Sequence, residues 1–173
     1  MKNAELAESI LAELSGRGET LVSAESLTGG MIGALLTDVP GASESYLGGV
    51  ISYATRLKAT LAGVDRATVA ELGPVAERTA VEMARGVAQQ CDADWGLATT
   101  GVAGPEPQDG HPVGQVFVAV SHGASNAIRV EELSLQGNRT QIRQQSVSAA
   151  LQLLADALGL QHAAAEVDDA SSR

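Results

Sequence analysis

Short apolar runs alternate with helical segments along most of the chain. Strands are expected at residues 20–24, 47–53 and 95–100, and helices at residues 4–15, 31–37, 55–62, 65–72, 76–91 and 139–159. Strands that alternate with helices usually form a parallel sheet with helices packed on both of its faces. The pattern therefore predicts an α/β fold in the form of a single three-layer α/β/α sandwich.

Two consecutive strands are expected before the last helix. Residues 113–120 are almost uniformly apolar, as in a strand that is covered on both faces, and a short loop at 122–125 leads to a further strand at 127–135. Strands joined so closely form one antiparallel pair, so the sheet is expected to be mixed but mostly parallel. The apolar residues of 127–135 change parity, which predicts a β-bulge near Glu131 and Glu132.

Apolar stripes on the longer helices predict which faces are buried. The expected stripes are Leu6, Ile10, Leu11 and Leu14 in the first helix, Ala80, Ala84, Val87, Ala88 and Cys91 in the helix at 76–91, and Val147, Leu151, Leu154 and Leu158 in the last helix. Because Cys91 falls on a stripe, it is expected to be an inert core residue.

Composition and charge exclude several classes of protein. No apolar run approaches the roughly 18–20 residues of a membrane-spanning helix, so no membrane partner is expected. The net charge of −10 would repel a polyanion, and four aromatic residues are too few for base stacking, so no nucleic-acid partner is expected. The acidic start of the chain lacks the features of a signal peptide, which predicts a cytoplasmic location.

The 173 residues are expected to form one domain over residues 1–160, followed by a disordered tail at 161–173 that is rich in Ala and Asp. The single cysteine excludes an internal disulfide. The three histidines lie far apart in the sequence and no pair has ligand spacing, so no metal site is expected.

Ligands of open α/β sheets bind beyond the carboxyl ends of the strands. Ser26 follows the strand at 20–24 and precedes Thr28, Gly29 and Gly30. The Ser26 hydroxyl could be a nucleophile, and the turn could present backbone N–H groups to an oxyanion or a phosphate. Alternatively, Ser26 or Thr28 only caps the following helix.

Two further strand ends carry polar residues. Tyr53 ends the strand at 47–53, and Lys58 follows it about one helical turn later. A buried lysine with a lowered pKa can activate a serine, although most lysines are exposed and inert. Thr100 and Gly101 stand at the end of the strand at 95–100, where the glycine turn could add to an anion-binding floor or be a plain turn.

Arg139 and Arg143 begin the last helix and share one face of it, because they are four residues apart. Together they could clamp a phosphate or a carboxylate, although Arg143 could instead pair with a surface acid.

Six stretches of the chain, taken in order, resemble the CinA C-terminal domain family. They are AESLTGG (24–30), GGVISYATRLKATLAGV (48–64), GPVAERTAVEMARG (73–86), ATTGVAGP (98–105), PVGQVFVAV (112–120) and GNRTQIRQQ (137–145). Stand-alone members of this family are nicotinamide-nucleotide amidohydrolases, which hydrolyse the carboxamide of nicotinamide mononucleotide to nicotinic acid mononucleotide and ammonia. The resemblance implies this activity and a three-layer fold on a mixed sheet.

The resemblance also implies a role for each matching residue. Ser26 would be the nucleophile, Lys58 its general base, and Tyr53 and Thr100 polar helpers at the reacting amide. The nucleotide substrate would be held by Thr28, Gly29, Gly30, Gly101, Arg139 and Arg143. No metal or organic cofactor is needed, and family precedent suggests a homodimer. Leu27 stands where the family often has Cys, but it lies beside the nucleophile, so activity is expected to survive.

Two other functions stay open at this point. The chain could be a non-catalytic, regulatory module that binds a nucleotide in the same pocket, because a fold does not guarantee an activity. It could also be an amidase that acts on another small carboxamide.

Overall fold

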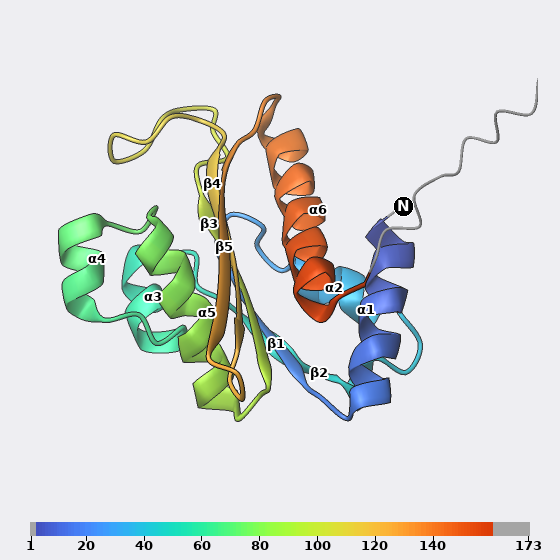
Figure 1. Ribbon diagram of the computed structural model, residues 1–173. Coiled ribbons are helices and arrows are strands. Elements are labelled where there is room, and N and C mark those ends of the chain that lie inside the picture. Colours follow the sequence, from blue (N-terminus) through green and yellow to red (C-terminus); the bar gives the residue numbers. More distant parts are fainter. Residues whose placement is uncertain (1–2, 161–173) are drawn as a thin grey trace, which may run out of the picture.

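The computed structural model describes residues 3–160 and shows a sheet between two layers of helices (Figure 1). The sheet has five strands in the order β2-β1-β3-β4-β5. They are β1 (Leu21–Glu25), β2 (Tyr46–Ile51), β3 (Trp95–Gly101), β4 (Gln115–His122) and β5 (Ala127–Ser134). The helices are α1 (Asn3–Arg17), α2 (Met31–Thr37), α3 (Thr55–Leu61), α4 (Arg66–Leu72), α5 (Glu77–Cys91) and α6 (Arg139–Leu158), with a 3₁₀ turn at Ala42–Glu44. The predicted sandwich is confirmed, whereas the prediction for 161–173 lies outside the described residues.

The sheet is mixed, as expected, but its pairing differs from the prediction in one respect. β1 pairs in parallel with both β2 and β3, whereas β4 is antiparallel to both β3 and β5. The predicted antiparallel pair, β4 with β5, is confirmed, but β3 and β4 form a second antiparallel pair that was not predicted. The physical reason is the connection over residues 102–114, which contains no crossover helix, so β4 returns directly beside β3 in the opposite direction.

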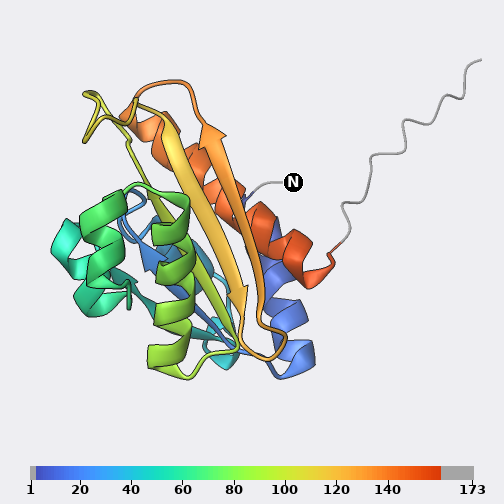
Figure 2. The ribbon, with the colours of Figure 1, turned by 60° about the vertical axis from the view of Figure 1, so that its left-hand side comes forward.

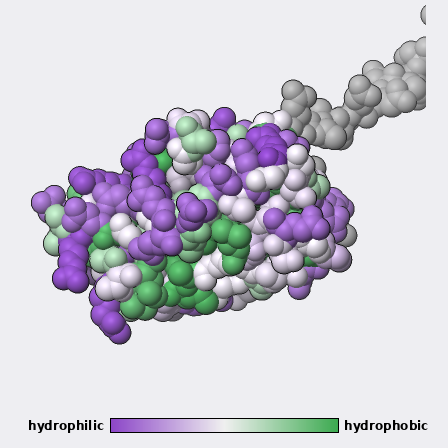
Figure 3. Space-filling view, turned by 90° about the horizontal axis from the view of Figure 1, so that it is seen from below, coloured by the Kyte–Doolittle hydropathy of each residue, from purple (hydrophilic) through white to green (hydrophobic). Residues whose placement is uncertain are grey.

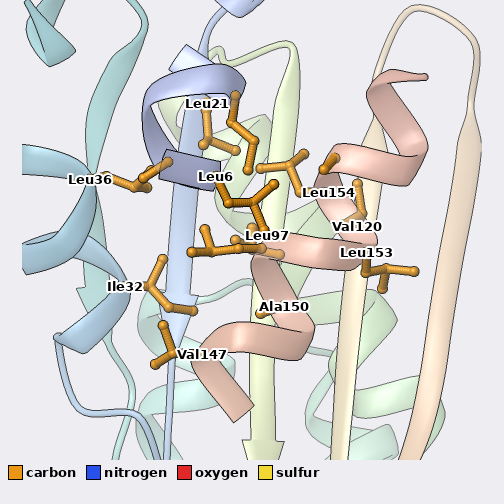
Figure 4. Packing of buried hydrophobic residues seen from close by; sticks show 14 of the residues in the cluster. Leu6, Leu21, Ile32, Leu36, Leu97, Val120, Val147, Ala150, Leu153 and Leu154 are labelled. Atoms are coloured by element: carbon orange, nitrogen blue, oxygen red, sulfur yellow. The ribbon is translucent and has the colours of Figure 1, made fainter. Parts of the chain in front are cut away.

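Helices α1, α2 and α6 cover one face of the sheet, and α3, α4 and α5 lie on the other (Figures 1 and 2). On the first face, side chains from α1, α2 and α6 meet those of the central strands, as Leu6, Ile32, Leu97 and Leu154 do in Figure 4. Every residue of the stripes predicted on α1 and α6 is buried. The pattern of apolar residues therefore determined correctly which sides of these two helices face the core.

The stripe predicted on α5 is confirmed except at its end. Ala80, Ala84, Val87 and Ala88 are buried, but Cys91 is exposed, so its prediction as a core residue was wrong. Residues 89–92 are all exposed, because the last turn of α5 extends past the part of the sheet that the helix covers. The helical period continues to Cys91, but no neighbouring element packs over it.

The β-bulge predicted near Glu131 and Glu132 was also wrong. β5 pairs with β4 in unbroken register from Ala127 to Ser134. Val130 packs on the core cluster under α5, whereas Leu133 packs on the cluster under α6. The apolar residues change parity because the two helices cover opposite faces of this edge strand at different points along it, and no extra residue is inserted.

The outer surface carries a few large apolar side chains. Leu47 and Ile51 of the edge strand β2 are half exposed, and so are Leu61 and Leu72 at the ends of α3 and α4. Figure 3 shows an apolar area among hydrophilic residues on the side of the molecule seen from below. Within residues 3–160, no helix combines the length and apolar character needed to cross a bilayer. The homodimer expected from the family resemblance stays a prediction.

Candidate active site

The carboxyl ends of the three parallel strands meet at one edge of the sheet. Glu25 at the end of β1 is in register with Ile51 of β2 on one side and with Thr99 of β3 on the other. The segments that follow these strands therefore converge, and they surround a cavity of about 130 Å³. The cavity wall includes six of the residues predicted from the sequence, namely Ser26, Tyr53, Lys58, Thr100, Gly101 and Arg139.

Ser26 and Lys58 are in direct contact in this cavity. Lys58 Nζ donates a hydrogen bond to Ser26 Oγ over 2.8 Å and a second one to the carbonyl oxygen of Ser52 over 3.0 Å. The Ser26 N–H donates to the carbonyl oxygen of Thr99, which ties the start of the turn to β3. A hydroxyl and an amine that are 32 residues apart in the chain are thus held within hydrogen-bonding distance.

The environment of Lys58 changes its acidity. Only 1% of the residue is exposed, although lysine is among the residues that are least often buried. Burial disfavours the charged ammonium and lowers its pKa from 10.5 to about 8. No salt bridge to Lys58 is present within residues 3–160. An appreciable fraction of the amine is therefore neutral near physiological pH, and a neutral amine can accept a proton from Ser26.

Thr100 and Gly101 form the part of the wall that β3 contributes. Thr100 is buried, and its hydroxyl donates to the carbonyl oxygen of Pro74 over 2.6 Å. Gly101 is required by the packing of the sheet, because a Cβ at this position would lie 2.6 Å from the carbonyl oxygen of Gln115 on the neighbouring strand. The absence of a side chain at Gly101 thus has a structural cause that is independent of any ligand.

Tyr53 and Arg139 lie together at the mouth of the cavity. The Arg139 guanidinium donates to the Tyr53 hydroxyl over 2.8 Å and to the carbonyl oxygen of Gly104 over 2.6 Å. Tyr53 is 59% exposed, in contrast to the buried Ser26 and Lys58. The site therefore has a desolvated interior with the hydroxyl and the amine, and a solvated rim with a guanidinium that can contact an anionic group.

The other four predicted residues do not line the cavity. Thr28 is fully buried and its hydroxyl is hydrogen-bonded to that of Thr99 over 2.8 Å. Gly29 and Gly30 have φ angles of 58° and 95°, a left-handed conformation that favours glycine. Arg143 donates to the carbonyl oxygens of Leu27 and Thr28. Thr28, Gly29 and Gly30 thus form the turn after Ser26, and Arg143 holds its backbone.

Sequence reasoning did not identify several residues of the site. Pro74 and Val75 line the cavity from the segment before α5, and Glu106 and Gln108 line it from the loop after β3. Pro74 and Val75 lie in one of the stretches on which the family resemblance rests, which could have drawn attention to them. For Glu106 and Gln108 the sequence carries no comparable signal, because residues 105–112 show only the composition of a loop. No group of three His, Cys, Asp or Glu residues in the described part of the chain could hold a metal ion.

The carboxylate of Glu25 is a further feature that the sequence did not reveal. Glu25 is 2% exposed and accepts hydrogen bonds from the backbone N–H groups of Gly30, Ile32 and Gly33, over 2.9–3.1 Å. A helix normally leaves these first N–H groups without a partner inside the helix. Because Glu25 occupies them, they do not offer a free cradle for a phosphate.

Curated proteins of similar sequence include members named CinA-like and competence-damage inducible. A CinA-like protein from Frankia casuarinae is 46% identical over 145 residues, which cover 84% of this chain and 33% of that protein. A putative competence-damage inducible protein from Halothermothrix orenii is 45% identical over 131 residues, which cover 75% of this chain and 32% of that protein. The chain thus spans about a third of the length of these curated relatives.

Solved structures are similar over nearly their whole length. The competence/damage inducible protein CihA from Agrobacterium tumefaciens superposes with a TM-score of 0.85 at 33% identity, covering 91% of this chain and 95% of that chain. A CinA superfamily protein from Enterobacter cloacae superposes with a TM-score of 0.87 at 28% identity, covering 91% and 93%. The family model of the CinA C-terminal domain matches residues 3–158. This chain therefore belongs to the CinA C-terminal domain family.

Proposed function

We propose that this protein is an amidohydrolase that converts nicotinamide mononucleotide into nicotinic acid mononucleotide and ammonia. The observation that carries the proposal is the contact of 2.8 Å between the buried Lys58 amine and the Ser26 hydroxyl. An amide is a poor electrophile, so its hydrolysis needs an activated nucleophile, a proton for the departing ammonia and donors near the developing oxyanion. The Ser26 and Lys58 pair supplies the first two of these.

The reaction proceeds in two halves. The neutral Lys58 amine takes the proton from Ser26, and Ser26 Oγ attacks the carboxamide carbon. The protonated Lys58 then gives its proton to the leaving nitrogen, which departs as ammonia and leaves an ester on Ser26. In the second half Lys58 takes a proton from water, the hydroxide attacks the ester, and Ser26 Oγ leaves and regains its proton from Lys58.

The shape of the site suggests how the substrate lies. A cavity of about 130 Å³ is smaller than the roughly 300–1,000 Å³ of pockets that enclose a drug-sized ligand. The carboxamide and its ring would therefore enter the cavity, and the ribose phosphate would stay at the mouth. Arg139 lies at this rim and is the candidate for contact with the phosphate.

Replacement of Ser26 by alanine tests the proposal. We expect Ser26→Ala to lower ammonia release from the mononucleotide by about 1,000-fold or more, because the covalent route is lost. Far-UV circular dichroism and thermal unfolding should stay close to those of the wild type. Undiminished turnover by Ser26→Ala would refute the assignment of the nucleophile.

The two alternative functions give different results in the same assays. A regulatory module would bind the mononucleotide in calorimetry while the wild-type protein formed no product. An amidase with another substrate would release ammonia from carboxamides that lack the ribose phosphate at least as fast as from the mononucleotide. A panel of carboxamides with and without ribose phosphate therefore separates all three functions.

A further inference from the structure

The turn at residues 26–30 is held by two charged side chains for which the proposed reaction has no chemical role. Gly29 N–H donates to the carbonyl oxygen of Ser26 over 3.1 Å and closes the turn. Glu25, which precedes the turn, accepts the N–H groups of Gly30, Ile32 and Gly33. Hydrogen bonds to an ionised carboxylate are stronger than neutral ones, and a negative charge is favoured at the start of a helix. Glu25 thus fixes the end of the turn and the start of α2.

Arg143 holds the middle of the same turn from α6. Its Nε donates to the carbonyl oxygen of Leu27 over 2.9 Å and its Nη2 to that of Thr28 over 3.0 Å. The planar guanidinium is suited to this task because it presents several N–H groups in a fixed geometry. Nη2 would lie 3.3 Å from a Cβ at position 29, so a side chain there would press on the guanidinium.

The backbone groups that Arg143 binds are close to the nucleophile Ser26 in the chain. Leu27 follows Ser26 directly and lines the cavity, and its N–H has no hydrogen-bond partner among the described residues. The N–H of the residue after a nucleophile is well placed to stabilise the oxyanion that forms when the nucleophile attacks. The Thr28 carbonyl oxygen, which Arg143 holds, shares a rigid peptide plane with the Gly29 N–H. The Gly29 N–H in turn donates to the Ser26 carbonyl oxygen, which shares its peptide plane with the Leu27 N–H. Arg143 therefore limits the orientation of the Leu27 N–H through these two linked peptide planes.

We infer that Arg143 is a positioning residue that, together with Glu25, holds the turn so that the Leu27 N–H faces the developing oxyanion. Arg143 acts on catalysis through this backbone and does not hold the phosphate of the substrate. The hydrogen bonds of Arg143 and Glu25 to the backbone around the turn at residues 26–30 are called the clamp. The catalytic part of the inference rests on the proposed function, whereas the clamp does not.

The two arginines of α6 differ in a way that permits a matched comparison. Arg139 and Arg143 are four residues apart on one helix, but Arg139 lines the cavity and Arg143 does not. Arg139 is bonded to the rim of the cavity, through the Tyr53 hydroxyl and the Gly104 carbonyl oxygen. If both arginines bound the phosphate, their substitutions would have the same kinetic signature.

The experiment compares Arg143→Gln, Arg143→Lys and Arg139→Gln with two substrates, nicotinamide mononucleotide and the riboside that lacks the phosphate. We expect Arg143→Gln to lower kcat by about 10- to 100-fold for both substrates and to change KM for the mononucleotide by less than about twofold. Arg143→Lys should recover part of the rate, because an ammonium can bond one of the two carbonyl groups. Arg139→Gln should raise KM for the mononucleotide only. An increase of KM confined to the mononucleotide in Arg143→Gln would overturn the inference.

Amide hydrogen exchange provides a readout that does not depend on the reaction. Arg143→Gln should accelerate exchange in the segment 26–33 by about tenfold or more, and Arg139→Gln should leave this segment unchanged. Thermal unfolding of each variant checks that the protein is folded. If the wild-type protein hydrolysed neither substrate, the proposed function would be refuted. The hydrogen-exchange data would still test whether Arg143 holds the turn. Wild-type exchange in folded Arg143→Gln would overturn the clamp whatever the kinetic result.

Discussion

Each end of the sheet carries a hollow, and the two hollows differ in chemistry as well as in size. The cavity at the carboxyl ends of the parallel strands measures about 130 Å³, whereas a hollow between the end of α5 and the β4–β5 hairpin measures about 210 Å³. The smaller one contains a buried amine against a hydroxyl. The larger one is lined mostly by exposed residues such as Gln89 and Asn126.

This difference shows that desolvation of a reactive group identifies the site better than the volume of a cavity does. The larger hollow is lined by exposed charged side chains such as Arg85 and Asp92, which keep their hydration. Lys58 has lost its hydration, and its pKa falls to about 8 as a result. Four predictions follow from the contrast between these two ends.

The largest effect is expected from Lys58→Met, which removes the amine and keeps an apolar side chain of similar length. Ammonia release should fall by about 1,000-fold or more, because Ser26 loses its base. The same variant should be more stable than the wild type at pH 7, by on the order of 2–3 kcal/mol, because it no longer has to bury an ionisable amine. Denaturant unfolding at pH 7 measures this difference.

The gain in stability of Lys58→Met also has a defined pH dependence. The pKa of Lys58 is about 8 when folded and close to 10.5 when unfolded, so the unfolded chain binds more protons between these values. The wild type should therefore gain stability as the pH rises from about 8 to 10.5, and the advantage of the variant should shrink over this window. A difference that stayed constant over this window would mean that Lys58 titrates normally in the folded protein.

The second prediction concerns the activity of the wild type. If the neutral amine is the base, kcat/KM should rise about tenfold between pH 7 and pH 9, with a midpoint near pH 8. The assay should measure ammonia at low substrate concentration, so that the profile reports the free enzyme. A profile that is flat over this range would show that the activity does not depend on the titration of Lys58. The desolvated amine would then no longer distinguish the two ends of the sheet.

A smaller effect is expected at the other end of the sheet from Trp95→Phe. The ring of Trp95 stacks on His122 with centroids 4.2 Å apart, and its Nε1 donates to Glu19. The substitution keeps an aromatic ring but loses this hydrogen bond to a charged group, at a cost of about 1–2 kcal/mol in the free energy of unfolding. Activity at 25 °C should stay within twofold of the wild type, which steady-state kinetics can check.

The smallest effect is expected from Arg85→Gln in the wall of the larger hollow. Arg85 is exposed, so its loss should change the free energy of unfolding by less than about 0.5 kcal/mol. Ammonia release should also be unchanged, because the hollow lies at the opposite end of β3 from the cavity. A strong loss of activity in Arg85→Gln would show that the two ends are coupled.

The layered fold could be predicted from the sequence because its signals are local and periodic. The stripes of α1 and α6 repeat at helical spacing, and every predicted position on them is buried. The predictions were wrong where neighbouring elements cover only part of a helix or a strand. Cys91 continues the period of α5 beyond the sheet, and Val130 and Leu133 face different helices along one edge strand.

The candidate site was predicted in part, and the limit has a physical cause. Ser26, Lys58 and Thr100 could be named because they lie at or shortly after the carboxyl ends of strands, which must share one edge of the sheet. The sequence could not predict that Arg139 binds the rim of the cavity and Arg143 the turn after Ser26. Both lie on one face of a helix, and only their hydrogen-bond partners distinguish them. Likewise, the sequence does not show that Glu25 already occupies the start of α2.

By itself the sequence determined the alternation of strands and helices, the family to which the chain is similar and the hydroxyl and amine that are candidates for chemistry. Only the tertiary structure decided that these two groups touch and that the amine is desolvated, because both facts depend on segments that are distant in the chain and packed together. A pKa is a property of the surroundings of a group, and these surroundings exist only in the folded protein.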